Sequence, residues 1–171
     1  MTIDEAAALI AHSSLDGSTW ADLGCGDGTF TRALATLLQD GSTIHAMDQD
    51  RRALAGMPRR YADAALVTHV GDFTAQPWPF GDLDGALFAN SLHYVRDKAG
   101  LLRACATAFS RQRLLIVEYD TDIANPWVPY PVSAGKLAQV LTEAGLSKVT
   151  WLATRPSRYR SAALYAVLAE A

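Results

Sequence analysis

The chain has 171 residues, of which half are hydrophobic and 19% are charged. This length fits one domain that buries roughly 70% of its unfolded surface, and the composition excludes the class of disordered proteins. The formal net charge of −3 disfavours polyanionic partners, so we expect neither nucleic acid nor a membrane surface as a partner. We predict a single domain over 1–171, with an N-terminal helix over 1–14 and a core over 18–171.

The cysteines and the N-terminal segment indicate the cellular compartment of the protein. Cys25 and Cys105 lack the spacing of a metal site, which fits a reducing compartment. The N-terminal segment carries two carboxylates where a secretion signal needs basic residues, and no apolar run approaches the ~18 residues of a spanning helix. We therefore expect a cytoplasmic protein. No metal site is predicted either, because no ligand spacing occurs among the histidines His12, His45 and His69.

Strand and helix patterns alternate through the first two thirds of the chain. Residues 18–24 and 42–48 are predicted strands, and residues 29–39 between them have the apolar periodicity of a helix. The elements predicted after these are a helix over 51–62, strands over 65–70 and 83–89, a helix over 96–109 and a strand over 113–119. Such alternation predicts a doubly wound α/β sheet with parallel strands.

The last third has a different pattern. Residues 133–146 form a predicted helix that ends at Gly145, and strands over 148–154 and 161–169 follow it. The connection over 155–160 is so short that these two strands must form an antiparallel hairpin. The fold class is therefore α/β, a Rossmann-like sheet of seven strands that is mostly parallel, with one antiparallel strand in a C-terminal hairpin.

A glycine-rich loop follows the first predicted strand, in the sequence Asp22-Leu-Gly-Cys-Gly-Asp-Gly28. Glycines allow the backbone to approach a ligand closely, and in α/β sheets ligands bind at the carboxyl ends of the strands. A dinucleotide fingerprint would need a glycine at position 29, but Thr29 stands there. The spacing therefore makes NAD the weaker hypothesis for the ligand.

The segment from Asp22 to Gly28 resembles motif I of the class I S-adenosylmethionine (SAM)-dependent methyltransferases. Asp48 closes the second predicted strand and is similar to the family's ribose-binding acid, while Asp72 is similar to its adenine-side acid. Residues 89–95, ANSLHYV, are similar to its motif IV region. The resemblance extends over essentially the whole chain, and it implies the family's fold, SAM as cofactor and methyl transfer as activity.

The same resemblance implies roles for individual residues. The helix that starts near Gly28 would receive the methionine carboxylate, and Asp22 would face the ammonium group. Asp48 would accept hydrogen bonds from the ribose hydroxyls, and Asp72 from the adenine amino group. The predicted cofactor-binding residues are Asp22, Gly24, Gly26, Gly28, Asp48, Gln49, Asp72, Phe73 and Asn90.

The acceptor side is less clearly defined by the sequence. His93 follows the fourth predicted parallel strand and is our candidate general base, although a purely structural role at a helix start stays open. Tyr94 and, after the next strand, Tyr119, Trp127 and Tyr130 are candidate substrate residues. The alternative for the segment after that strand is a loop made rigid by its prolines.

The sequence therefore predicts an enzyme that transfers a methyl group from SAM to an oxygen, nitrogen or carbon atom of a small molecule. Two alternatives stay open: a SAM-binding module without catalysis, and a methyltransferase that acts on a protein or RNA. Only 21 residues precede Asp22. The site is therefore either open or completed by a second subunit in a homodimer.

Overall fold

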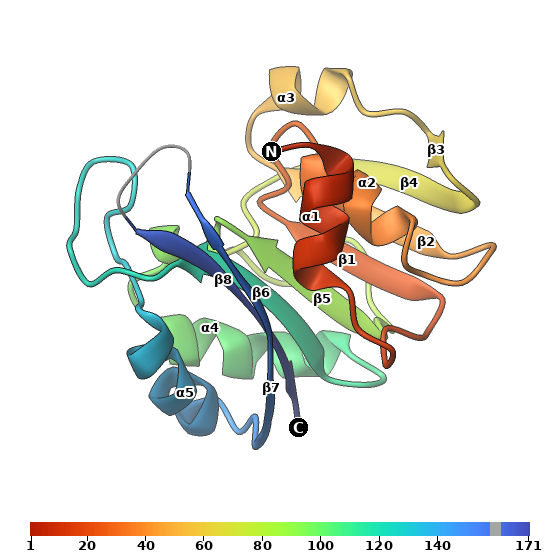
Figure 1. Ribbon diagram of the computed structural model, residues 1–171. Helices are drawn as coiled ribbons and strands as arrows, with labels where there is room; N and C mark the ends of the chain where they lie inside the picture. Colours follow the sequence, from red (N-terminus) through yellow and green to blue (C-terminus); the bar gives the residue numbers. More distant parts are fainter. Residues whose placement is uncertain (158–161) are drawn as a thin grey trace.

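The protein was analysed as a computed structural model, which describes residues 1–157 and 162–171. The strands of this described part are β1 (Thr19–Leu23), β2 (Thr43–Asp48), β3 (Arg60–Tyr61), β4 (Ala64–Val70), β5 (Gly85–Ala89), β6 (Arg113–Tyr119), β7 (Lys148–Pro156) and β8 (Ala163–Glu170). They form one sheet in the order β3-β4-β2-β1-β5-β6-β8-β7 (Figure 1). The predicted α/β class is confirmed, but the sheet has eight strands instead of seven.

The helices of the described part cover both faces of this sheet. They are α1 (Ile3–Ile10), α2 (Thr29–Ala35), α3 (Arg51–Ala55), α4 (Lys98–Cys105) and α5 (Ala134–Glu143), with 3-10 turns η1 (Leu92–Tyr94) and η2 (Ala106–Ala108). Helices α1 and α2 cover one face of the sheet, and α4 and α5 cover the other (Figure 1). The apolar side chains of each pair belong to a separate core cluster. No helix in the described residues is long and apolar enough to cross a membrane.

The five central strands β4, β2, β1, β5 and β6 run parallel. Strand β6 is buried along nearly its whole length, as expected for a parallel strand that is covered on both faces. Because the strands run parallel, their carboxyl ends meet at one edge of the sheet. That edge carries the loops in which we predicted the ligand-binding residues.

The segment 51–62, predicted as one helix, is only partly helical. Helix α3 ends at Ala55, because Gly56 follows and Pro58 lacks a backbone N–H and disfavours a helical conformation for the residue before it. The chain then turns through Ala62, at φ 48°, and Arg60–Tyr61 pairs antiparallel with β4. This short strand is the eighth one that the sequence pattern did not reveal.

The C-terminal hairpin is confirmed, with a longer first strand than predicted. Strand β8 pairs antiparallel with both β6 and β7, so it is the reversed strand at this end of the sheet. Arg155 and Pro156, predicted as part of the connection, belong to β7. Residues 158–161, which make up the rest of the predicted connection and the start of the last predicted strand, lie outside the described residues.

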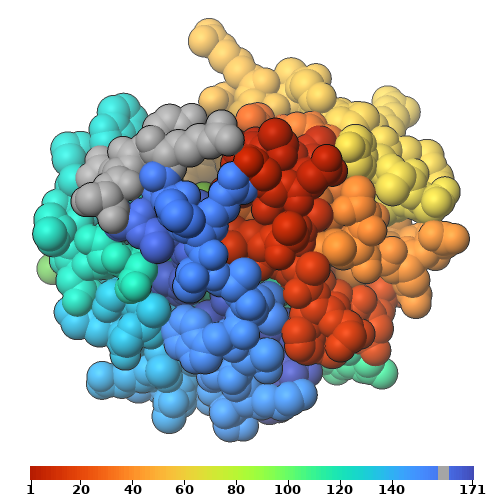
Figure 2. Space-filling view, in the orientation of Figure 1, coloured from red at the N-terminus to blue at the C-terminus, as the bar shows by residue number. Residues whose placement is uncertain are grey.

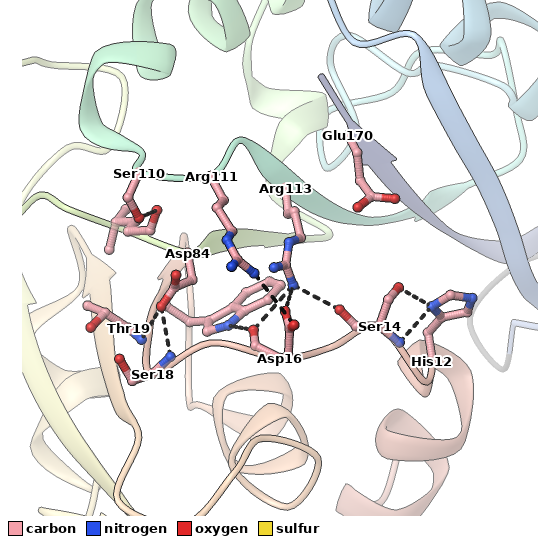
Figure 3. Close-up of polar contacts among 12 residues, drawn as sticks. His12, Ser14, Asp16, Ser18, Thr19, Asp84, Ser110, Arg111, Arg113 and Glu170 are labelled. Atoms are coloured by element: carbon pink, nitrogen blue, oxygen red, sulfur yellow. Dashed lines mark hydrogen bonds and ion pairs between the residues drawn. The ribbon is translucent and has the colours of Figure 1, made fainter.

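The amino edge of the sheet is closed by polar contacts (Figure 3). The Asp84 carboxylate accepts hydrogen bonds from the backbone N–H groups of Ser18 and Thr19, at 2.7 and 3.1 Å. Arg113 is buried and donates to the Ser14 carbonyl at 2.8 Å and to both the carbonyl and the carboxylate of Asp16. These contacts fix the segment between α1 and β1 against the end of the sheet.

Candidate active site

A cavity of about 840 Å³ opens at the carboxyl edge of the sheet. It lies around the junction of β1 and β5, where the strand order reverses direction, and this is the usual ligand position in open α/β sheets. Most of the predicted cofactor-binding residues line it. The lining residues that were predicted are Gly24, Gly26, Asp48, Gln49, Asp72, Phe73, Asn90, Tyr94 and Tyr119.

The loop after β1 brings the backbone to the cavity wall. Gly24 has φ 79°, and a Cβ atom there would lie 2.5 Å from the Cβ of Ser91 and 3.2 Å from the ring of Phe73. Gly26 has φ 54° and faces open space, because a Cβ atom there would meet no atom within 4 Å. Gly24 and Gly26 therefore line the cavity, whereas Gly28 lies at the start of α2 and is not a lining residue.

Asp48 connects the end of β2 to the glycine-rich loop. One carboxylate oxygen accepts the Gly26 N–H at 2.8 Å and the other accepts the Asp50 N–H at 2.8 Å. A carboxylate oxygen has more than one lone-pair direction, so both oxygens keep capacity for a ligand hydroxyl. The carboxylate is thus held in a fixed orientation at the cavity, as a bidentate acceptor for a diol requires.

Asp72 and Phe73 follow β4 at the far side of the cavity. Oδ1 of Asp72 accepts hydrogen bonds from the backbone N–H and the hydroxyl of Thr74, at 2.8 and 2.7 Å. Phe73 is buried, and its carbonyl accepts the indole N–H of Trp78 at 2.9 Å. These contacts fix the turn so that Asp72 and the Phe73 backbone border the cavity.

Two buried oxygen atoms near the carboxyl edge of the sheet have no hydrogen-bond partner among the described residues, Oδ1 of Asp22 and Oδ1 of Asn90. Asn90 lines the cavity, whereas Asp22 does not. Asp22 is completely buried and accepts only the hydroxyl of Thr31, at 2.6 Å. Burial raises the pKa of Asp22 to about 7, and the nearby Asp48 carboxylate adds to this rise. The hydrogen bond from Thr31 acts in the opposite direction. Unpartnered buried acceptors are costly. A ligand that donates hydrogen bonds here would therefore be stabilised.

The structure buries His93, the candidate base, behind the cavity wall. The two oxygens of Glu118 accept the backbone N–H of His93 at 3.0 Å and contact its Nδ1 at 2.7 Å. The His93 ring lies 4.4 Å from the ring of Tyr94 and 6.3 Å from that of Tyr119, measured between centroids. His93 is therefore behind two cavity-lining tyrosines and is not itself a lining residue.

The loop between β6 and α5 places two predicted substrate residues outside the cavity. Trp127 is 73% exposed at the tip of a turn in which the Asn125 side chain accepts two backbone N–H groups. Tyr130 is 40% exposed, and its carbonyl accepts the ammonium group of the buried Lys98 at 2.6 Å. Neither side chain belongs to the cavity lining.

No sequence pattern indicated the residues of the opposite wall of the cavity. Glu5 from α1 and Arg155 from β7 form an ion pair there, and both line the cavity together with Met1. Figure 2 shows the surfaces of α1 and β7 against each other. The two residues are 150 positions apart, so only the packing of α1 beside β7 brings them together.

The described lining is acidic. It contains four carboxylates and one guanidinium group, from Glu5, Asp27, Asp48, Asp72 and Arg155. Such a lining favours a cationic ligand and disfavours a polyphosphate. Within the described residues, no three His, Cys, Asp or Glu side chains lie close enough together to hold a metal ion.

Comparison with solved structures agrees with this architecture. A Burkholderia thailandensis 1,6-didemethyltoxoflavin-N1-methyltransferase with bound 1,6-didemethyltoxoflavin and S-adenosylhomocysteine superposes with a TM-score of 0.73 at 18% identity, over 98% of this chain and 77% of that one. A SAM-dependent methyltransferase of the DUF858 family from Leishmania major gives 0.71 at 18% identity, over 96% and 70%. The SAM-bound magnesium protoporphyrin IX methyltransferase of Synechocystis PCC 6803 gives 0.64 at 17% identity, over 97% and 77%.

Sequence comparison gives the family. A search of curated proteins found no significant match. Residues 21–111, however, match the methyltransferase domain family, and this segment is more than half of the chain and contains the glycine-rich loop, Asp48, Asp72 and the end of β5. The chain therefore belongs to the methyltransferase domain family.

Proposed function

We propose that the protein transfers a methyl group from SAM to a small-molecule acceptor in the cavity at the carboxyl edge of the sheet. The observation that carries this proposal is the pair of buried, unpartnered oxygens of Asp22 and Asn90 near the carboxyl edge of the sheet, where an acidic cavity opens. Both are acceptors, and SAM brings an ammonium group and a positive charge. When bound, SAM supplies a methyl group that its sulfonium activates.

The residues present fit the donor. Asp48 is oriented to accept the ribose hydroxyls, because backbone N–H groups hold both of its oxygens in place. Asp72, oriented by Thr74, would accept the adenine amino group beside Phe73. Asp22 and Asn90 would accept the ammonium group, directly or through water. Gly26 leaves room for the donor close to the backbone, whereas the missing side chain of Gly24 allows Ser91 to pack against the loop.

A small acceptor is supported by the size and charge of the cavity. Its volume, about 840 Å³, is near the upper end for small-molecule sites and leaves room for a second compound beside the donor. The acidic lining opposes an RNA substrate. Structural neighbours from Burkholderia and Synechocystis are named for small acceptors, 1,6-didemethyltoxoflavin and magnesium protoporphyrin IX.

A methyl acceptor can lose a proton when it is methylated, and His93 is the proposed base that takes this proton. Glu118 contacts Nδ1, which favours the tautomer with the proton on that atom and leaves Nε2 as the basic nitrogen. Because the ring is buried beside Tyr94 and Tyr119, this role requires the acceptor to reach Nε2 past these two rings. His93→Gln should leave SAM affinity unchanged and lower turnover by about 100-fold or more.

The test is release of S-adenosylhomocysteine in the presence of SAM and a panel of small phenols, amines and heterocycles. Turnover with at least one compound, and its loss in His93→Gln, is the expected result. SAM binding without turnover on any small molecule, protein or RNA would support the module without catalysis instead. Turnover only with RNA or protein would overturn the small-molecule assignment, and unchanged turnover of His93→Gln would remove His93 from the chemistry.

A further inference from the structure

The cavity has two chemically different halves. The ends of β1, β2 and β4 contribute the glycines, Asp48 and Asp72 of the proposed donor half. The other half is lined from the ends of β5 and β6, from the first turn of α2 and from the hairpin. We call this second part the acceptor half. Its apolar and aromatic lining residues are Phe30, Ala89, Tyr94, Tyr119, Pro156 and Leu164.

The aromatic residues of the acceptor half lie too far from the adenine side to serve the donor's base. In the strand order, β5 is three strands from β4 and β6 is four strands from it. Neighbouring strands are about 4.8 Å apart, so Tyr94 and Tyr119 follow strands that lie roughly 14 and 19 Å from the one that precedes Asp72. Both tyrosines therefore lie on the side of the cavity away from the proposed adenine position.

The two tyrosines form one wall. Both rings lie beside the ring of His93, which Glu118 holds in place from behind. The wall is therefore backed by a buried, hydrogen-bonded pair. Tyr94 is 54% exposed although it lies in a cavity, so most of its ring faces open space. Large, rigid side chains that expose a ring in this way are typical of ligand-contact positions.

The following inference rests on the proposed function. We propose that the methyl acceptor is a compound with an aromatic ring and that this ring binds against Tyr94 and Tyr119. Aromatic rings pair favourably with tyrosine beyond the area that they bury, whereas saturated rings of the same size gain only the burial. Phe30 from α2 adds a third aromatic side chain to this half. Tyr94 and Tyr119 are then the residues that determine acceptor specificity.

The experiment uses the full chain saturated with S-adenosylhomocysteine and two probes of matched size, 2-naphthol and its saturated counterpart 2-decalol. Binding is followed by calorimetry. S-adenosylhomocysteine is titrated first, so that a failure of the donor half is seen separately from a failure of the acceptor half. We expect 2-naphthol to bind about tenfold more tightly than 2-decalol.

Three variants test which residues cause the preference for 2-naphthol over 2-decalol. Tyr94→Leu and Tyr119→Leu should each weaken 2-naphthol binding by about three- to tenfold and leave 2-decalol binding within twofold. Trp127→Leu is the matched control, because Trp127 is exposed but lies outside the cavity lining, and it should change neither affinity. Normal binding of S-adenosylhomocysteine shows that each variant is folded.

Several results would overturn the inference while the proposed function stands. Equal affinity for the two probes, or no binding of either by protein that binds S-adenosylhomocysteine, shows that the acceptor half does not select aromatic rings. A preference that survives both tyrosine substitutions, or that disappears in Trp127→Leu, places the contact elsewhere. Absence of S-adenosylhomocysteine binding instead contradicts the proposed function itself.

Discussion

At the amino edge of the sheet the polar side chains have hydrogen-bond partners, whereas at the carboxyl edge two buried oxygens have no partner within the described residues. Asp84 and Arg113 hold the segment before β1 through hydrogen bonds to its backbone (Figure 3). Asp22 and Asn90, at the other end of neighbouring strands, each keep one unpartnered oxygen. The same strands thus carry stabilising contacts at one edge and binding capacity at the other.

This difference predicts different effects of substitutions at the two edges. A buried acceptor without a donor destabilises the fold, and such groups persist where a ligand completes them. Substitutions at the amino edge should therefore change the free energy of unfolding and leave ligand binding unchanged. Substitutions at the carboxyl edge should weaken ligand binding, and removal of the buried Asp22 carboxylate there should also raise the free energy of unfolding. Four predictions test this contrast, from the largest expected effect to the smallest.

The largest effect should be a pH dependence of stability that comes from Asp22. Because burial raises its pKa to about 7 in the fold, the folded chain binds the proton more tightly than the unfolded chain does, and stability falls as the pH rises from about 4 through 7. Asp22→Asn removes this ionisation. Without ligand it should match the wild type at pH 4 and be more stable at pH 8, by up to about 4 kcal/mol.

Urea unfolding of both proteins at the two pH values measures this prediction. The Thr31 hydroxyl can still donate to the side-chain oxygen of the asparagine, so its hydrogen bond is retained. A difference between the two proteins that stays constant from pH 4 to pH 8 would show that Asp22 is not a strained, buried carboxyl.

The second effect concerns binding. Asp48→Ala should weaken SAM binding by about 100-fold or more, because the ribose hydroxyls lose a charged acceptor for two hydrogen bonds. Asp50→Ala is the control, since Asp50 only caps α3 and does not line the cavity. Calorimetry with SAM compares the two. Similar affinities for both variants would mean that the ribose does not bind at Asp48.

The third effect belongs to the amino edge. Arg113→Met keeps the buried stem but removes the hydrogen bonds to Ser14 and Asp16, and it should lower the free energy of unfolding by about 2 kcal/mol. Arg111→Met is the matched control, because its 3.5 Å ion pair with Asp16 is solvent-exposed and should contribute less than about 0.5 kcal/mol. SAM affinity should be unchanged in both variants, and a loss of affinity in Arg113→Met would break the separation of the two edges.

The smallest effect should come from Asp84. Asp84→Ala leaves the N–H groups of Ser18 and Thr19 without their acceptor and should cost about 1 kcal/mol in unfolding free energy. Asp84→Asn keeps one acceptor oxygen and should cost less. If the alanine variant is as stable as the asparagine variant in urea unfolding, these hydrogen bonds do not hold the segment.

The sequence predicted the cavity-lining loops after β1, β2 and β4 better than the opposite wall of the cavity. The glycine-rich loop, Asp48 and Asp72 could be located because each directly follows a parallel strand, and parallel strands end at one edge. Glu5 and Arg155 could not be found, because their proximity depends on how α1 packs beside β7. The burial of His93 also depends on a distant partner, Glu118 on β6.

Fold prediction failed where short-range and long-range effects compete. Residues 51–55 are helical as predicted, but the pattern that suggested a helix through residue 62 was interrupted by Gly56 and Pro58. The strand Arg60–Tyr61 has only two residues and exists through pairing with β4, so no local periodicity indicates it. The central strands were predictable because burial on both faces requires continuous apolar runs.

The most direct test of the central claim is a calorimetric titration of the wild-type protein with SAM, S-adenosylhomocysteine and NAD in parallel. We predict micromolar binding of the first two at one site per chain, and no binding of NAD, because Thr29 interrupts the dinucleotide spacing and the lining is acidic. Binding of NAD without SAM or S-adenosylhomocysteine would contradict the assignment of the cavity as a methyl-donor site.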